Sequence, residues 1–169
     1  MDLDSVKSFR LGLKKNKKLE ILEMNECNLS NSNIHYICDS ILENQILKSF
    51  SIQSNYFTSP GFSSISKLIQ RTKSLNSINL NGNIPGGCLK EYFESLKLNE
   101  TITELHMDKF ELSKHPSGFR WVYDYFKNKK YKILEIGNNG FNENSMIYIS
   151  KLLKFNPYIE HFIFNSIII

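Results

Sequence analysis

The side chains that could carry catalytic or metal chemistry are sparse in this sequence. Its four histidines are His35, His106, His115 and His161. Only His106 and His161 fall on predicted strands, and one further strand separates the two, so their backbones lie roughly 10 Å apart. A shared zinc ion would need each ligand nitrogen about 2 Å from the metal. No HExxH, CxxC or GxSxG motif is present. We therefore expect no enzymatic activity, no metal ion and no cofactor.

The cysteines, and the absence of targeting and membrane-spanning patterns, indicate the cellular compartment that we expect. Cys27, Cys38 and Cys88 are an odd number with no close pair, which is atypical of a disulfide scaffold and favours a reducing compartment. Cys88 follows a Gly-Gly turn and is expected to be the most exposed of the three. There is no signal-peptide pattern, and no apolar run reaches membrane-spanning length. We expect a cytoplasmic protein without a membrane partner.

The polar side chains that could bind a partner are positioned by a repeated pattern. The stretch LNSINLNGN, residues 75–83, has the form LxxLxLxxN, and similar stretches recur every 27 to 29 residues. Such a period predicts a solenoid with a strand and a helix in each unit. The first apolar position of the pattern is held by Leu19, Leu47, Leu75, Ile102, Tyr131 and Ile159. The next is held by Leu22, Phe50, Ile78, Leu105, Leu134 and Phe162. The third is held by Met24, Ile52, Leu80, Met107, Ile136 and Phe164, and on a strand it faces the same side as the second.

A helix precedes each strand in this pattern. The columns ten and six residues before the strand are apolar in every unit and share one helix face. Counted in this way, Trp121 and Tyr125 are expected in the core, whereas Tyr123 and Phe126 are expected to be more exposed. Three residues before the strand stand Asn16, Asn44, Thr72, Asn99, Asn128 and Asn156. Asparagine tolerates the left-handed conformation that ends many helices, so we expect these residues to end the helices in that conformation.

A second asparagine column lies eight residues after the first apolar position, where each strand should turn. It holds Cys27, Asn55, Asn83, Phe110, Asn139 and Ile167. An amide side chain there can bond the turning backbone. Phe110 and Ile167 depart from the rule, so we expect a rebuilt turn after the fourth strand. Together these columns predict one α/β domain over residues 1–169, with about six repeats, a parallel sheet on the concave side and helices on the convex side. The helix over residues 4–16 would be half a repeat, and the chain could be a fragment of a longer protein.

The concave face of the predicted sheet is the candidate binding surface. Its side chains lie between the core columns, and they are predominantly acidic, about −4 in sum, whereas the whole chain is +4. This sign argues against nucleic acid on that face and leaves about +8 on the helices and loops. A solvated polar sheet is the alternative interpretation. The residues assigned to partner binding are Glu23, Asn25, Glu26, Ser51, Gln53, Asn79, Asn81, His106, Asp108 and Glu135.

The repeat resembles the ribonuclease-inhibitor-like leucine-rich repeats. The segments LKKNKKLEILEMNECNL (residues 13–29) and LKLNETITELHM (96–107) are most similar to the CARMIL and tropomodulin style. This resemblance implies a leucine-rich repeat solenoid and a protein–protein interaction scaffold. It also implies two narrower alternatives, an actin-regulatory module and a GTPase-activating protein of the Ran-activating type. The acidic tail of the Ran-activating family is absent, and no Arg or Asn constellation can be carried over from it.

The last predicted strand raises the question of what covers it. The sequence finishes IEHFIFNSIII, with no further helical pattern behind it. An open parallel strand offers unpaired N–H and C=O groups to a neighbour. We therefore expect self-association, or adjoining repeats, at this strand.

Overall fold

The computed structural model describes residues 3–55 and 57–165. It consists of six helices and six strands that alternate along the chain, with two short 3-10 helices, η1 (Gly86–Cys88) and η2 (Leu112–Lys114). The strands are β1 (Ile21–Glu23), β2 (Ser49–Ser51), β3 (Ser77–Asn79), β4 (Glu104–His106), β5 (Ile133–Glu135) and β6 (His161–Ile163). The helices are α1 (Leu3–Lys15), α2 (Asn31–Asn44), α3 (Ser59–Arg71), α4 (Leu89–Leu98), α5 (Gly118–Phe126) and α6 (Glu143–Phe155). None of the helices in the described ranges is long and apolar enough to cross a membrane.

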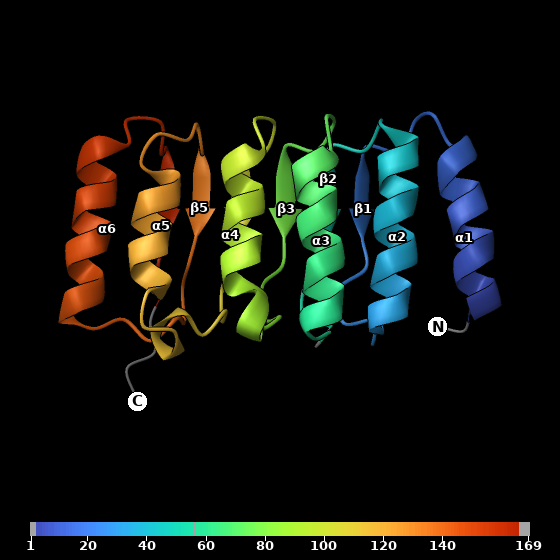
Figure 1. Cartoon of the computed structure of the whole chain (residues 1–169). Coiled ribbons are helices and arrows are strands. Elements are labelled where there is room, and N and C mark those ends of the chain that lie inside the picture. The colour runs from blue at the N-terminus through green and yellow to red at the C-terminus, as the bar shows by residue number, and fades with distance from the viewer. Residues whose placement is uncertain (1–2, 56, 166–169) are drawn as a thin grey trace.

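The strands form one parallel sheet in sequence order, and the helices lie side by side on one of its faces (Figure 1). Neighbouring strands need about 4.8 Å, whereas packed helices need about 8–10 Å. The helix layer is therefore the longer one, and the sheet lies on the inside of the resulting curve. The predicted α/β leucine-rich repeat solenoid is confirmed.

The strand register agrees with the apolar columns read from the sequence. The central residue of each strand pairs with the central residue of the next. Four of these residues, Phe50, Ile78, Leu105 and Leu134, are fully buried under the helices. Because a shift of one residue would turn them outward, their burial fixes the register. The outward positions between them form the concave face.

The turn after β4 is rebuilt, as expected, because Phe110 replaces the asparagine of its column. The ring is 1% exposed and enters the core. It packs edge-to-face on Phe62 and Tyr92, with centroids 5.6 and 5.5 Å away. The following backbone then passes through a left-handed residue, Glu111, before η2 begins. An apolar contact has thus taken the place of a polar turn.

The turns after β2, β3 and β5 are closed by three buried residues, which we call the strand-end asparagines: Asn55, Asn83 and Asn139. Each amide donates backward to a carbonyl of the preceding repeat and to carbonyls of its own turn. Asn55 Nδ2, for example, lies 2.8 Å from Met24 O and 2.9 Å from Ile52 O. The amide oxygens accept backbone N–H groups from the preceding repeat. The role predicted for this column is confirmed at these positions, and Ile167 lies outside the described residues.

The asparagines before the strands act differently from the prediction. Three of them, the helix-end asparagines Asn44, Asn99 and Asn156, donate to carbonyls at the end of the preceding helix. Asn99 and Asn156 have extended backbone, and the left-handed residue after α2 is Gln45. The expected left-handed conformation was therefore wrong. Asparagine is used there for its side-chain donors, which satisfy carbonyls that a helix end leaves open.

In the fifth unit the helical core face is shifted by one residue from the prediction. Phe119, Val122 and Phe126 are buried, whereas Trp121 and Tyr125 are only partly covered. Four residues lie between the end of α5 and the first apolar position of the next unit, compared with three after α4. Counting backward from the strand therefore lands one residue off the buried face.

Candidate functional site

The assigned residues lie on the concave face, and all of them except Ser51 are exposed or only partly buried. Glu23, Asn25 and Glu26 are exposed, and six of the others are partly buried: Gln53, Asn79, Asn81, His106, Asp108 and Glu135. Ser51 is only 6% exposed, because its hydroxyl donates to Asn25 Oδ1 at 2.7 Å and Asn25 lies over it. Little of Ser51 is therefore accessible to a partner in this structure, and its assignment to partner binding stays a prediction. Ser51 helps to hold Asn25, whose Oδ1 also accepts the Gln53 N–H at 2.8 Å.

A second polar group joins three neighbouring strands further along this face. Glu135 Oε2 accepts from Asn81 Nδ2 at 2.9 Å and lies 2.7 Å from His106 Nδ1. His106 and Glu135 are paired positions on β4 and β5. Since an ionised carboxylate can only accept, Nδ1 carries the proton in this arrangement. The contact fixes the orientation of the imidazole ring, and Nε2 is the acceptor when the ring is neutral.

Asp108 extends this group toward the end of the sheet. Its backbone N–H donates to Asn81 Oδ1 at 2.7 Å, and Asn138 Nδ2 donates to both of its carboxylate oxygens. Partial burial raises the pKa of Asp108, and the nearby Glu135 charge adds to the increase, while the bonds from Asn138 oppose it. The space above this carboxylate depends on Gly137, because a Cβ there would lie 2.5 Å from Asp108 Oδ1.

Sequence reasoning did not include Asn138 in the site. Its column lies at the end of the fifth strand, outside the positions assigned to binding. The signal that could have found it is the turn sequence Gly137-Asn138-Asn139-Gly140, which favours left-handed backbone. Asn138 has φ of 50°, and this conformation belongs to the turn that brings its amide to Asp108.

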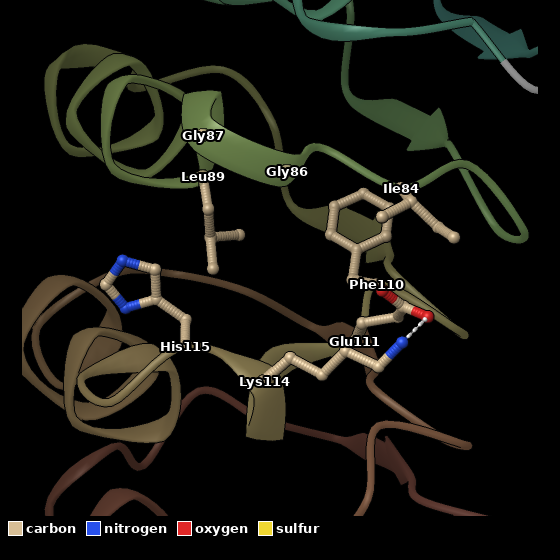
Figure 2. Close-up of a pocket in the computed structure, with 8 residues that line it drawn as sticks. All are labelled: Ile84, Gly86, Gly87, Leu89, Phe110, Glu111, Lys114 and His115. Atoms are coloured by element: carbon tan, nitrogen blue, oxygen red, sulfur yellow. Dashed lines mark hydrogen bonds and ion pairs between the residues drawn. The ribbon is translucent and has the colours of Figure 1, made fainter.

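The edge of the array where strands turn into helices is hollowed, a feature that sequence reasoning also missed. A depression of about 200 Å³ is bounded by Ile84, Leu89 and Phe110 on one side and by the Glu111–Lys114 ion pair on another (Figure 2). Two further depressions of about 350 Å³ each also border Ile84, which is 45% exposed. We call this side the hollow edge. The unusual Phe110 was its only sequence signal.

The groups that could hold a metal or react as nucleophiles do not assemble. Within residues 3–55 and 57–165, no three His, Cys, Asp or Glu side chains are placed to share a metal ion. Cys27 is the most exposed cysteine, and Cys88 is partly covered, with its thiol donating to Ser59 O at 3.4 Å. The expectation that Cys88 would be the most exposed was wrong, because helix α3 packs beside it. Cys38 is buried, and burial raises the pKa of its thiol.

Comparison with known proteins identifies the fold but no family. No family model matches the chain, and no curated protein matches it. Many solved structures have a similar fold, among them the following two. The tropomodulin C-terminal domain of Caenorhabditis elegans matches with a TM-score of 0.74 at 16% identity, covering 89% of this chain and 92% of that one. The domain described as leiomodin-1 actin-binding site 2 matches with a TM-score of 0.71 at 17% identity, covering 92% of this chain and 90% of that one.

Proposed function

We propose that this chain is a protein-binding repeat module that receives a basic or polar partner surface on its concave face. The observation that carries the proposal is the pre-arranged polar group formed by Asn81, His106, Asp108, Glu135 and Asn138. Side chains that already hold one another lose little conformational freedom when a partner arrives, and this lowers the cost of association. The predominance of carboxylates on this face favours a partner with lysine or arginine side chains.

Actin is the specific partner that one observation favours. The leiomodin-1 domain that shares this fold is described as an actin-binding site. The segments at residues 13–29 and 96–107 also resemble the repeats of actin regulators. We therefore propose actin as the first partner to test, and actin-cytoskeleton regulation as the narrower function.

The test uses the full chain, purified actin and a pair of matched variants. The concave variant, Glu23→Lys with Glu104→Lys, reverses two charges on the concave face. Neither side chain takes part in the hydrogen bonds described above. Asp39→Lys with Glu94→Lys makes the same change on the helix layer. Cosedimentation with filaments and a polymerisation assay measure binding. We expect the concave variant to bind about tenfold more weakly than wild type, with the loss growing at low salt, and the helix-layer variant to bind normally.

Different outcomes test actin as the partner and the concave face as the binding site. If wild-type chain neither sediments with actin nor alters polymerisation, actin is the wrong partner. The broad proposal is then tested on proteins retained from a lysate by the immobilised chain. Loss of a retained protein with the concave variant alone supports the concave site. Equal retention by both variants contradicts it.

A further inference from the structure

The edge opposite the hollow edge concentrates the positive charge of the molecule. All helices run antiparallel to all strands, so each helix end and each following strand start meet along one edge, the upper one in Figure 1. We call it the lysine edge and define it by residues 12–20, 41–48, 68–76, 95–103, 123–132 and 152–160. It carries 13 basic and five acidic residues, a net charge of +8, in a chain whose total is +4. Its basic residues are Lys14, Lys15, Lys17, Lys18, Lys48, Arg71, Lys73, Lys97, Lys127, Lys129, Lys130, Lys132 and Lys154.

Neutralisation of the helix dipoles accounts for only part of this charge. Five of the basic residues lie in the last turn of a helix, where a cation is favoured. The other eight lie beyond the helix ends, and α5 has no basic residue in its last turn although four lysines follow it. The dipole effect falls off within the last turn. The additional lysines therefore call for another explanation.

Internal ion pairs neutralise only a few of these basic side chains. Within the described residues, the ion pairs of this edge are Lys14–Glu43, Lys129–Glu100 and Lys132–Glu160. The last of these is long, at 3.9 Å. The ten remaining basic side chains form no ion pair in that part of the chain, and most of them are exposed. Their ammonium and guanidinium groups stay available to an external anion.

Exposed apolar side chains lie among these lysines. Leu98 ends α4 and is 61% exposed, Phe155 ends α6 and is 54% exposed, and Tyr158 follows it at 45%. Lys130 lies 5.9 Å from the Tyr158 ring centroid, and Lys154 lies 5.5 Å from that of Phe155. Aromatic and aliphatic tips combined with surrounding lysines suit the interface of a lipid bilayer, where the tips enter the headgroup region and the ammonium groups meet lipid phosphates and carboxylates.

We propose that the lysine edge docks onto the surface of an anionic lipid bilayer. The helix ends lie at nearly one level along this edge (Figure 1), so many repeats can touch a flat surface at once. A nucleic acid fits less well, because one face of the Tyr158 and Phe155 rings is already covered by lysine and Leu98 offers nothing to a base or phosphate. The earlier expectation of no membrane partner rested on the lack of a spanning segment and did not address a peripheral surface. This proposal is independent of the concave site.

The test measures cosedimentation of the full chain with phosphatidylcholine vesicles that contain about 30 mol% phosphatidylserine. Each lysine close to this anionic headgroup contributes about a fivefold gain in binding. Pure phosphatidylcholine vesicles are the reference. The lysine-edge variant combines Lys15→Gln, Lys18→Gln, Lys73→Gln and Lys130→Gln, all at exposed positions. The control combines Lys7→Gln, Lys67→Gln, Lys90→Gln and Lys109→Gln, which are exposed elsewhere and give the same net charge.

We expect wild type to bind the anionic vesicles only, and the lysine-edge variant to bind at least about a hundredfold more weakly. The control should stay within about threefold of wild type. Leu98→Ser with Phe155→Ser should weaken the binding that persists at high salt, where lysine contacts are screened. The proposal is overturned if wild type ignores anionic vesicles, or if both lysine variants lose equally. It is also overturned if a single-stranded oligonucleotide or a polyglutamate peptide binds more tightly than the vesicles and displaces the chain from them.

Discussion

The two edges of this array use asparagine for the same task and differ in which side chain takes over where an asparagine does not perform it. At the hollow edge the strand-end asparagines bond each turn to the preceding repeat, and at the lysine edge the helix-end asparagines do so. Where the first row is interrupted, Phe110 turns into the core and the loop after it is rebuilt around a depression.

In the fifth unit the asparagine of the second row is present but exposed, and a charged donor takes over. Asn128 is exposed, and Lys129 instead sends its ammonium to Asn99 O at 2.7 Å and to Glu100 Oε1 at 2.9 Å. These two cases show that the surroundings of a turn or helix end decide which side chain closes it. A turn above the core can be closed by an aromatic ring, whereas a helix end beside solvent accepts a long cation, which the helix dipole also favours.

We expect the largest loss of stability from a substitution in the core, which lies between the two edges. Leu80 is fully buried beneath β3 and its neighbours. We expect Leu80→Ala to lower the free energy of unfolding by about 2–5 kcal/mol, because it leaves a cavity. Since each unit contacts only its neighbours, the loss should also broaden the transition. Urea denaturation measures both, and an unchanged midpoint would mean that Leu80 is not in the core.

The strand-end row should tolerate truncation less well than the helix-end row. Asn83 is fully buried and bonds Ile52 O, Leu80 O and Asn55 N. We expect Asn83→Ala to cost about 2–4 kcal/mol, because several buried backbone groups lose their partners. Asn99, at 6% exposure, lies closer to solvent. Asn99→Ala should cost about 1–3 kcal/mol, since water can replace part of its bonding. Equal costs in chemical denaturation would remove the distinction between the two rows.

The role of Lys129 in place of Asn128 at the lysine edge can be tested within one turn. Lys129→Met keeps most of the side-chain volume and removes the ammonium from Asn99 O. We expect a loss of about 1 kcal/mol, because the bond involves a charged group that is still partly solvated. Asn128→Ala, the matched control, should change stability by less than about 0.5 kcal/mol. If thermal or urea unfolding ranked the two variants the other way, Asn128 rather than Lys129 would be closing the helix end.

The smallest expected effect concerns Asp108, beside the hollow edge. Its pKa in the folded chain lies above the ordinary value of 3.8, mainly because of burial. Between the unfolded and folded pKa values the folded chain binds more protons, so this residue lowers stability progressively as pH rises through that window. Asp108→Asn should remove this contribution, and it keeps an acceptor for Asn138. In urea titrations from about pH 3 to pH 6, the free energy of unfolding of the variant should fall less, or rise more, with pH than that of wild type.

A control defines what that result means. Asp124→Asn makes the same change at an exposed carboxylate of α5 and serves as the matched control. If Asp108→Asn behaved like Asp124→Asn, the burial of the Asp108 carboxylate would have no thermodynamic consequence.

The sequence by itself determined the repeat, the strand register and the identity of the concave face. These follow from the period: about 28 residues leave room for one strand and one helix in each unit, so apolar side chains recur in register on both. It also identified Asn55, Asn83 and Asn139 as turn residues, because buried turning backbone needs an amide partner. The self-association expected at the last strand stays a prediction, since residues 166–169 lie outside the described part of the chain.

Only the tertiary structure decided how the side chains share space. The burial of Ser51 under Asn25, the contact of His106 with Glu135 and the clamp of Asn138 on Asp108 all join residues about 26 to 30 positions apart. The shifted face of α5 followed from one extra residue that no column count could place on the correct side of the helix end. The gathering of the lysines is a further case. Their charges are dispersed along the sequence, and they form one edge because every helix is antiparallel to every strand.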